Sequence, residues 1–223
     1  MCGICGQLRF DKKPVQSGVL STMMSKIARR GPDASGQWSD GSIGFGHQRL
    51  SIIDLSNYAA QPMKDEALDL VLVFNGTIYN YQSLRQDLTK QGYSFFSHSD
   101  TEVIIKAYHF WGEDCVTHLD GMFAFCIWNQ KNNQLFVARD RMGIKPLYFN
   151  MTDQAFSFAS NTQALVAIGV DSSINSVALQ QQLSLHGVVP APNTILNGVN
   201  KIKPATTLTI DAKGKVVEKT YWQ

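Results

Sequence analysis

The sequence predicts an α+β layered domain that is built mainly from antiparallel strands. Segments rich in aromatic and β-branched residues follow one another without the regular strand–helix alternation that is typical of a parallel sheet. Segments with helical spacing of apolar residues separate groups of these strands. A chain of 223 residues is also long enough to bury a stable core without disulfides or metals.

The first predicted elements are a strand, a helix and two buried strands. Residues 3–10 alternate short apolar and polar residues, which predicts a strand that begins almost at the terminus. Residues 15–28 place apolar side chains at helical spacing, and Gly31-Pro32 ends that helix. Residues 43–51 and 70–74 have the apolar character of buried strands.

The next segments predict a turn and two helices. Asn75-Gly76 follows a buried strand and favours a tight turn, because both residues tolerate a left-handed backbone. A helix is predicted over 81–90, where Leu84 and Leu88 share one face. The Ser99–Glu102 segment matches the capping-box pattern, which predicts that another helix begins there.

The second half of the chain predicts a meander of antiparallel strands. Asn132-Asn133 is the expected hairpin turn between the first two of these strands. A short helix is expected over 176–185, and a final hairpin over 206–210 and 216–222. The strands of the meander are predicted at 122–128, 134–138, 147–149 and 155–159.

Composition excludes several classes of partner. The net charge is +2 and charged residues make up only 17% of the chain, without a basic stripe, so no nucleic-acid partner is expected. The longest apolar run, Met122–Trp128, is far shorter than the roughly 20 residues that span a bilayer. Because the first residues also lack the features of a secretory signal, we expect a soluble, cytoplasmic protein with no membrane partner.

The four cysteines, Cys2, Cys5, Cys115 and Cys126, are too few and too scattered for a disulfide scaffold, so free thiols are expected. The five histidines are also scattered singly. A structural zinc site needs four ligands at short spacing. No metal site is therefore expected.

Cys2 is the chemically distinctive residue. Removal of Met1 would leave a cysteine with a free α-amine of pKa about 7.7 to 8 beside a thiol of pKa about 8.5. The amine can accept the thiol proton and later deliver it to a departing ammonia. One residue then supplies both the nucleophile and the general base of an acyl transfer, and no histidine is required.

Two other interpretations of this terminus stay open. Cys2 can be an inert small residue at a frayed end, or it can pair with Cys5 in a redox or metal motif. A redox motif of this spacing normally follows a strand and starts a helix, a context that these first residues do not offer.

A series of motifs, in order along the chain, resembles the glutamine-hydrolysing domain of asparagine synthetase-type proteins, which belongs to the class II glutamine amidotransferases. The stretch 186–206, followed by Tyr221-Trp222, also resembles the bacterial branch that amidates N-acetylglutaminylglutamine. The motifs are MCGICG at 1–6, RRGPDASG at 29–36, GHQRLSIIDLS at 46–56, QPM at 61–63, FNGTIYNY at 74–81, SDTEVI at 99–104, DGMFAF at 120–125 and ARDRMGIKPLY at 138–148.

This resemblance implies a four-layer α/β/β/α N-terminal-nucleophile hydrolase sandwich with two mostly antiparallel sheets, formed by residues 1–223 as one glutaminase domain. The ATP-dependent synthetase domain, with its pyrophosphate-binding Ser-Gly-Gly motif, is absent from the sequence. No cofactor is therefore expected here. ATP and magnesium would serve only that C-terminal domain, which is the expected partner, and a homodimer is compatible with the sequence.

The resemblance also assigns roles to five residues. Cys2 would form a γ-glutamyl thioester, and Asn75 and Gly76 match the family's oxyanion donors, for which a plain turn is the alternative interpretation. Arg49 matches the residue that binds the substrate α-carboxylate, and would otherwise be a surface arginine. Asp100 matches the residue that binds the α-ammonium group, and would otherwise serve the helix dipole.

Two positions depart from the family pattern. Thr77 stands where asparagine synthetases usually have Glu, so one contact to the substrate ammonium is missing or replaced. Asn161 stands where the family often has Glu. The segments 30–33 and 139–148 are interpreted as structural, the first of them as a loop near the pocket.

The sequence therefore predicts an enzyme that hydrolyses L-glutamine to L-glutamate and ammonia, which an ATP-dependent amide-forming domain would use. The alternative is a non-catalytic module of the same fold that acts as a regulatory or interaction surface for a synthetase partner. Thr77 would then be a sign of eroded glutamine binding.

Overall fold

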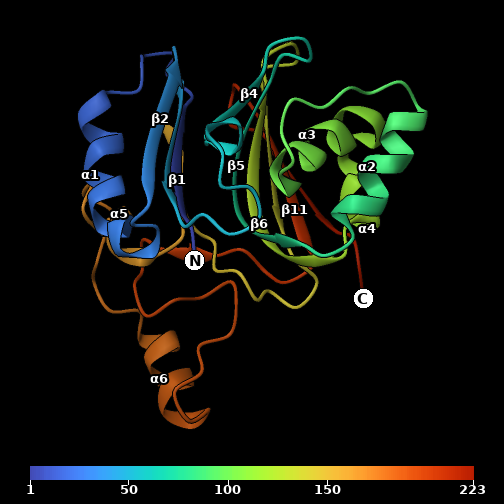
Figure 1. Ribbon diagram of the computed structural model, residues 1–223. Helices are drawn as coiled ribbons and strands as arrows, with labels where there is room; N and C mark the ends of the chain where they lie inside the picture. Colours follow the sequence, from blue (N-terminus) through green and yellow to red (C-terminus); the bar gives the residue numbers. More distant parts are fainter.

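The computed structural model describes all 223 residues and contains two six-stranded sheets that pack face to face between helices (Figure 1). Every strand pair in both sheets is antiparallel. Helices cover the outer face of each sheet (Figure 1). The predicted α+β class and the four-layer sandwich are confirmed.

The first sheet has the amino-terminal strand near its centre, so the segment that carries Cys2 enters the interior of the fold at once. All residues of this strand except the last, Arg9, are buried. The strand order is β10 (Asn200–Lys201), β8 (Tyr148–Met151), β9 (Ala155–Ala159), β1 (Gly3–Arg9), β3 (Ile43–Arg49) and β2 (Ala34–Asp40).

The second sheet is centred on two long strands that pair along their whole length. Its outermost strand on one side is short and leaves part of its neighbour's edge unpaired. The order is β12 (Val216–Thr220), β11 (Thr206–Asp211), β7 (Gln134–Arg139), β6 (Gly121–Asn129), β5 (Leu70–Ile78) and β4 (Met63–Asp65).

Strand β5 shows how the core is divided into layers. Val71 and Val73 pack into the cluster between the two sheets, whereas Leu72 and Phe74 pack on the helical side. Because side chains alternate along a strand, Asn75 continues the face of Val71 and Val73 and points between the sheets.

The helices lie on the two outer faces of the sandwich, except for one that projects from it (Figure 1). Helices α1 (Ser17–Ile27) and α5 (Thr162–Val166) lie over the first sheet, and α2 (Tyr81–Lys90), α3 (Asp100–Trp111) and α4 (Cys115–His118) lie over the second. The projecting helix is α6 (Ser176–Ser184). Short 3-10 helices cover Ala28–Arg30, Asn57–Ala59 and Gly112–Asp114. None of the helices has both the length and the apolar character needed to cross a membrane.

The predicted turn at Asn75-Gly76 is wrong. Both residues lie inside β5, opposite Ala124 and Phe123 of β6. The ladder with β6 overrides the local preference of the pair for a turn. Glycine is still needed there, since an added Cβ at Gly76 would lie 2.2 Å from the carbonyl oxygen of Met122.

The predicted meander is also wrong, because its four strands divide between the sheets. Strands β6 and β7 pair in the second sheet, and β8 and β9 pair in the first. The connecting segment turns around Asp140, whose carboxylate accepts the N–H groups of Met142, Ile144 and Lys145. This turn leads the chain from one sheet to the other, which agrees with the structural interpretation of 139–148.

A buried cluster of charges joins β4 to α3. The Lys106 ammonium group contacts the Asp65 carboxylate, and the Glu102 carboxylate lies 3.9 Å from the same nitrogen. All three side chains are buried. Glu102 also accepts the N–H groups of Phe96 and Ser97, so Asp65 is the member that depends most on Lys106.

Replacing Lys106 by methionine should lower the free energy of unfolding by about 3–5 kcal/mol, because the Asp65 charge would stay buried without its partner. Urea denaturation monitored by circular dichroism measures this change. The double variant Lys106→Met with Asp65→Leu should recover most of the loss, since it removes both charges. A single variant as stable as the parent would contradict the prediction.

Candidate active site

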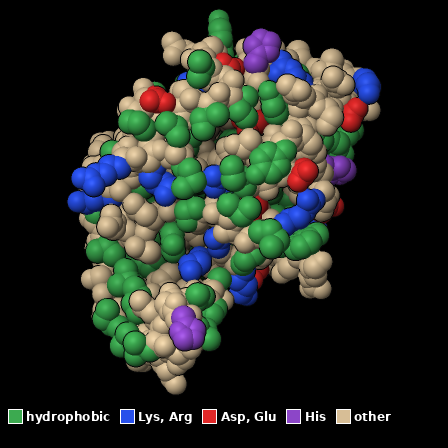
Figure 2. All heavy atoms as spheres, turned by 60° about the horizontal axis from the view of Figure 1, so that its bottom comes forward, with side chains coloured by type: hydrophobic (Ala, Val, Ile, Leu, Met, Phe, Trp, Pro, Cys, Tyr) green, Lys and Arg blue, Asp and Glu red, His purple; other side chains and the backbone are tan.

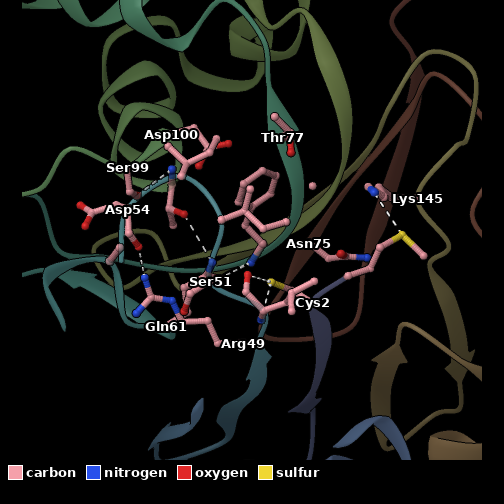
Figure 3. A pocket seen from close by; sticks show the side chains of 18 of the residues that line it. Cys2, Arg49, Ser51, Asp54, Gln61, Asn75, Thr77, Ser99, Asp100 and Lys145 are labelled. Atoms are coloured by element: carbon pink, nitrogen blue, oxygen red, sulfur yellow. Dashed lines mark hydrogen bonds between the residues drawn. The ribbon is translucent and has the colours of Figure 1, made fainter. Parts of the chain in front are cut away.

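A cavity of about 150 Å³ opens between segments that are far apart in the sequence (Figure 3). The five residues predicted as site residues, Cys2, Arg49, Asn75, Gly76 and Asp100, all line it. The structure therefore brings together the chain start, the end of β3, the middle of β5 and the first turn of α3. The other lining residues are Met1, Leu50, Ser51, Ile52, Ile53, Asp54, Ala59, Gln61, Phe74, Thr77, Ser99, Thr101, Met122 and Lys145.

Cys2 lies directly before β1, and its thiol points at the backbone of Leu50. The Cys2 Sγ accepts the Leu50 N–H at 3.3 Å and lies 3.5 Å from the Leu50 carbonyl oxygen. It is the one cysteine that is not buried. Burial raises the pKa of Cys5 to about 12 and raises the pKa of Cys115 and Cys126 as well, so those thiols stay protonated.

Cys2 and Cys5 face different parts of the molecule. Cys5 packs with Met24 and Ala159 on the side of β1 that α1 covers. The Cys2 thiol lies instead at the cavity, against Leu50. The alternative of a redox pair is therefore not supported.

Two cationic side chains hold the first residues in place. The Arg30 Nε donates to the Cys2 carbonyl oxygen at 3.0 Å. The Lys145 Nζ lies 3.2 Å from the Met1 Sδ. Burial lowers the pKa of both Arg30 and Lys145. Arg30 thus fixes the backbone of Cys2, whereas Lys145 contacts the side chain of Met1. The Cys2 thiol stays at the cavity.

Asn75 brings a buried amide group without a partner to the cavity. The residue is only 1% exposed, and its Nδ2 has no hydrogen-bond acceptor in the structure. An unpartnered buried donor is costly, since it loses its hydrogen bonds to water without replacement. An acceptor placed in the cavity would remove that cost.

Gly76 presents its N–H to the same space. Phe123, which lies opposite Gly76 on β6, directs its N–H to the Asp140 carboxylate and its carbonyl to the Asp140 N–H. Gly76 and Phe123 therefore form a non-hydrogen-bonded pair, in which the Gly76 N–H points away from β6.

The free edge of β5 confirms this direction. Its N–H groups on either side of Gly76 are satisfied by side chains: Phe74 donates to Gln61 Oε1 at 2.6 Å, and Ile78 donates to Asp100 Oδ2 at 3.0 Å. The N–H of Gly76 lies between them along the edge that lines the cavity.

Arg49 is a buried residue at the end of β3, not a surface arginine. Its guanidinium group donates to the carbonyl oxygens of Ser56, at 3.0 Å, and Asp54. Because a guanidinium carries five N–H donors, three are left for another partner. Arg49 thus orders the loop over the cavity and can still bind an anion.

Asp100 is the first residue of α3, and Ser99 caps that helix by accepting the N–H groups of Thr101 and Glu102. The predicted capping box is only half formed, since the Glu102 carboxylate binds Phe96 and Ser97 instead of the Ser99 N–H. Asp100 is therefore not needed as a cap, and its carboxylate turns to the cavity. Burial raises the pKa of Asp100 to about 6.

His47 lies on β3, two residues before Arg49, and is fully buried. Neither ring nitrogen has a hydrogen-bond partner. Burial lowers the pKa of His47 to about 3, so the ring is neutral at ordinary pH. His47 does not line the cavity, and it lies on the face of β3 that Ile43 and Phe45 pack between the sheets.

The two departures from the family pattern occupy different places. Thr77 lines the cavity next to Gly76, as Figure 3 shows. Asn161 lies elsewhere, where its Oδ1 caps α5 by accepting the Ala164 N–H and its Nδ2 donates to the Lys26 carbonyl. Asn161 therefore has a structural role.

Several residues at the site could not be selected from the sequence. Asp54 orders the cavity loop by accepting the N–H groups of Ser56 and His98. Asp33 accepts the Ser51 N–H, which agrees with the interpretation of 30–33 as a loop near the pocket. Both residues lie within the motifs at 29–36 and 46–56, but the motifs do not reveal their roles, because the partners His98 and Ser51 lie on other segments. No group of three or more His, Cys, Asp or Glu side chains is placed to hold a metal ion.

This arrangement defines a class of protein. Two antiparallel sheets between helices, with a cysteine just before a central strand at a cavity between them, form the N-terminal-nucleophile hydrolase sandwich. The structure of glutamine phosphoribosylpyrophosphate amidotransferase from Bacillus subtilis, in complex with ADP and GMP, has this fold. It aligns over 99% of this chain and 49% of that chain with a TM-score of 0.73 at 19% identity.

The chain belongs to the glutamine amidotransferase domain family, whose model matches residues 1–222. Asparagine synthetase [glutamine-hydrolyzing] 1 of Bacillus subtilis is 40% identical over all of this chain. Putative asparagine synthetase [glutamine-hydrolyzing] 2 of Methanocaldococcus jannaschii is 35% identical, also over all of it. The chain spans 35% and 46% of the length of these two relatives.

Proposed function

We propose that this domain hydrolyses L-glutamine to L-glutamate and ammonia, with Cys2 as the nucleophile after removal of Met1. The observation that carries the proposal is the set of groups at the cavity: an accessible thiol, an unpartnered amide donor of Asn75 and the free N–H of Gly76. Hydrolysis of a carboxamide needs a nucleophile and two donors for the developing oxyanion.

The chemistry follows from these groups. The Cys2 α-amine accepts the thiol proton, and the sulfur adds to the side-chain carbonyl carbon of glutamine. The resulting oxyanion is stabilised by the Asn75 Nδ2 and the Gly76 N–H. The α-ammonium group of Cys2 returns its proton to the leaving nitrogen of glutamine. The carbon–nitrogen bond breaks, ammonia departs, and a γ-glutamyl thioester remains on Cys2. Water then adds to the thioester, and its collapse releases glutamate and the free thiol.

The same cavity holds the two charges that would select an amino acid. The Arg49 guanidinium would bind the α-carboxylate of glutamine through its remaining donors. The Asp100 carboxylate would bind the α-ammonium group of glutamine. Thr77 carries no charge, so it provides no second anion for that group. Glutamine would then be recognised by Asp100 alone at its ammonium end.

The direct test is to incubate the purified domain with glutamine and measure glutamate and ammonia. Intact mass spectrometry of the same protein should show the loss of Met1 and, after rapid acid quenching, a γ-glutamyl adduct on Cys2. Hydroxylamine should remove that adduct, since it cleaves thioesters. A protein that has lost Met1 but neither releases ammonia nor forms an adduct would contradict the proposal.

Glutamine binding should weaken at acidic pH because of Asp100. Its pKa of about 6 means that the carboxylate loses its charge as the pH falls through this value, and with it the attraction for the substrate ammonium. The dissociation constant of the inactive Cys2→Ala protein should rise by about tenfold per pH unit below this pKa. Isothermal titration calorimetry between about pH 5 and 8 measures it.

The matched control is Asp100→Asn in the same Cys2→Ala background. It should bind glutamine weakly, without this dependence on pH. A constant affinity of the Asp100 protein across the range would show that another group binds the ammonium.

We further propose that the ammonia passes to an ATP-dependent amide-forming domain of the full-length protein. Support comes from the relatives, which are named as glutamine-hydrolysing asparagine synthetases and are about two to three times as long as this chain. ATP and magnesium would be bound by that domain. The N-acetylglutaminylglutamine branch, the homodimer and the cytoplasmic location stay predictions.

A further inference from the structure

Helix α6 and the loop after it stand away from the sandwich (Figure 1). Only Ala178 of the nine helix residues is buried, so the rest of the helix has few contacts with the sheets. Its start is capped by Asn175, whose Oδ1 accepts the Ala178 N–H at 3.0 Å.

The surface of this projection is apolar and uncharged. From Ser172 to Asn200 the chain contains no Asp, Glu, Lys or Arg. Figure 2 shows hydrophobic side chains and a histidine on the projecting end of the molecule. Five aliphatic side chains, here called the α6 surface, are between 42% and 76% exposed: Val177, Leu179, Leu183, Leu185 and Val188.

The α6 surface is not the outer face of an ordinary amphipathic helix. Val177 and Leu179 lie about 200° apart around the helix axis, so apolar residues occur on opposite sides. A helix that is apolar on more than one side is normally buried on more than one side. A helix of this length is also marginal in water without tertiary contacts. The projection is therefore expected to be covered in the working protein.

We propose that the α6 surface is the docking site of the domain that follows residue 223 in the full-length protein. This inference rests on the proposed function, because that function supplies the second domain. The absence of charge fits an interface core, where charged residues are depleted. Exposed apolar patches of this kind mark interaction sites on soluble domains.

The position of the chain end favours a tethered domain over a second copy of this chain. The carboxyl terminus, the amino terminus and α6 all lie toward the same lower side of the sandwich in Figure 1. About two-thirds of the matched Bacillus subtilis relative lies outside the aligned region. A domain that continues from residue 223 starts on the side where α6 projects, and its tether gives it a high effective concentration there.

Hydrogen exchange tests this directly in two proteins, the 223-residue chain and the full-length protein. The amides of Leu179 and Leu185, which donate to Asn175 and Gln181, report on the helix. They should exchange at least about tenfold more slowly in the full-length protein, because docking suppresses local opening. Equal rates in the two proteins, or a full-length protein without a further domain, would overturn the proposal.

Leu183→Lys is the variant, because Leu183 is 76% exposed and its replacement disturbs no buried contact. In the full-length protein it should remove most of the extra protection of α6. Phe110→Lys, at another exposed apolar position, is the matched control and should keep it. Protection that increases with the concentration of the 223-residue chain alone would indicate a second copy and overturn the assignment. Glutamine hydrolysis by this chain should be unaffected by Leu183→Lys, so failure of docking and failure of the proposed activity are separable.

Discussion

Cys2→Ala should reduce glutamine hydrolysis by about four orders of magnitude or more, because the reaction loses the nucleophile and the thioester intermediate cannot form. The fold should survive, since Cys2 precedes β1 and its thiol is hydrogen-bonded only to the Leu50 backbone. The glutamate and ammonia assays described above measure the loss. Glutamine binding by the variant should persist, because Arg49 and Asp100 remain in place.

Cys5→Ala is the matched control for this experiment. Cys5 is three residues away within β1, and its side chain is buried on the side that α1 covers. Burial raises its pKa to about 12, so its thiol takes no part in the reaction. This variant should retain the activity of the parent, after correction for any loss of stability. Ammonia release by Cys2→Ala at the parental rate would refute the mechanism, and absence of glutamine binding would favour the non-catalytic module.

The second large effect is expected from Asn75→Ala. It removes the Nδ2 donor, while Gly76 keeps its N–H at the free edge of β5. Loss of one such donor costs about 2.7–4 kcal/mol of transition-state stabilisation, which corresponds to a decrease in kcat of about 10²–10³-fold. The KM should change little, because the donor acts on the oxyanion of the intermediate more than on the ground-state carbonyl.

Asn161→Ala is the control for loss of an asparagine side chain. It removes the cap of α5, which should cost about 1 kcal/mol of stability, and it leaves the cavity untouched. Its kcat should equal that of the parent. If Asn75→Ala kept the parental kcat, or lost activity only through a raised KM, Asn75 would be a binding residue and the oxyanion role would be wrong.

Much of the fold follows from local sequence patterns. Helix α2 is predicted at its observed bounds, since Leu84 and Leu88 form one buried stripe. Strand β1 is predicted to within a residue by its alternation, and the final hairpin pairs as expected. The spacing of apolar residues within each of these elements is enough to predict it, so the elements that pack against it need not be known.

Other elements depend on partners far along the chain. The sequence does not predict strand β2, because its residues are mostly exposed and polar and the strand forms through pairing with β3. Strand β4 has three residues and pairs only with β5. The local preference of Asn75-Gly76 is for a turn. Both residues instead lie in strand β5, because β6 pairs with β5 along its whole length. A local sequence pattern cannot predict hydrogen-bonded pairing with a strand that lies far away in the chain.

The sequence by itself determined the fold class and, through its motifs, the five candidate residues, and it predicts the chemistry of a cysteine exposed by removal of Met1. Only the tertiary structure decided that these residues line one cavity. Cys2, Asn75 and Asp100 come from different layers, and they meet beside the edge of β5 that stays unpaired because β4 begins only at Met63, opposite Leu72. The physical reason is that an unpaired strand edge must satisfy its N–H groups by other means. Gln61 and Asp100 satisfy two of them, and the Gly76 N–H between them is left for a ligand.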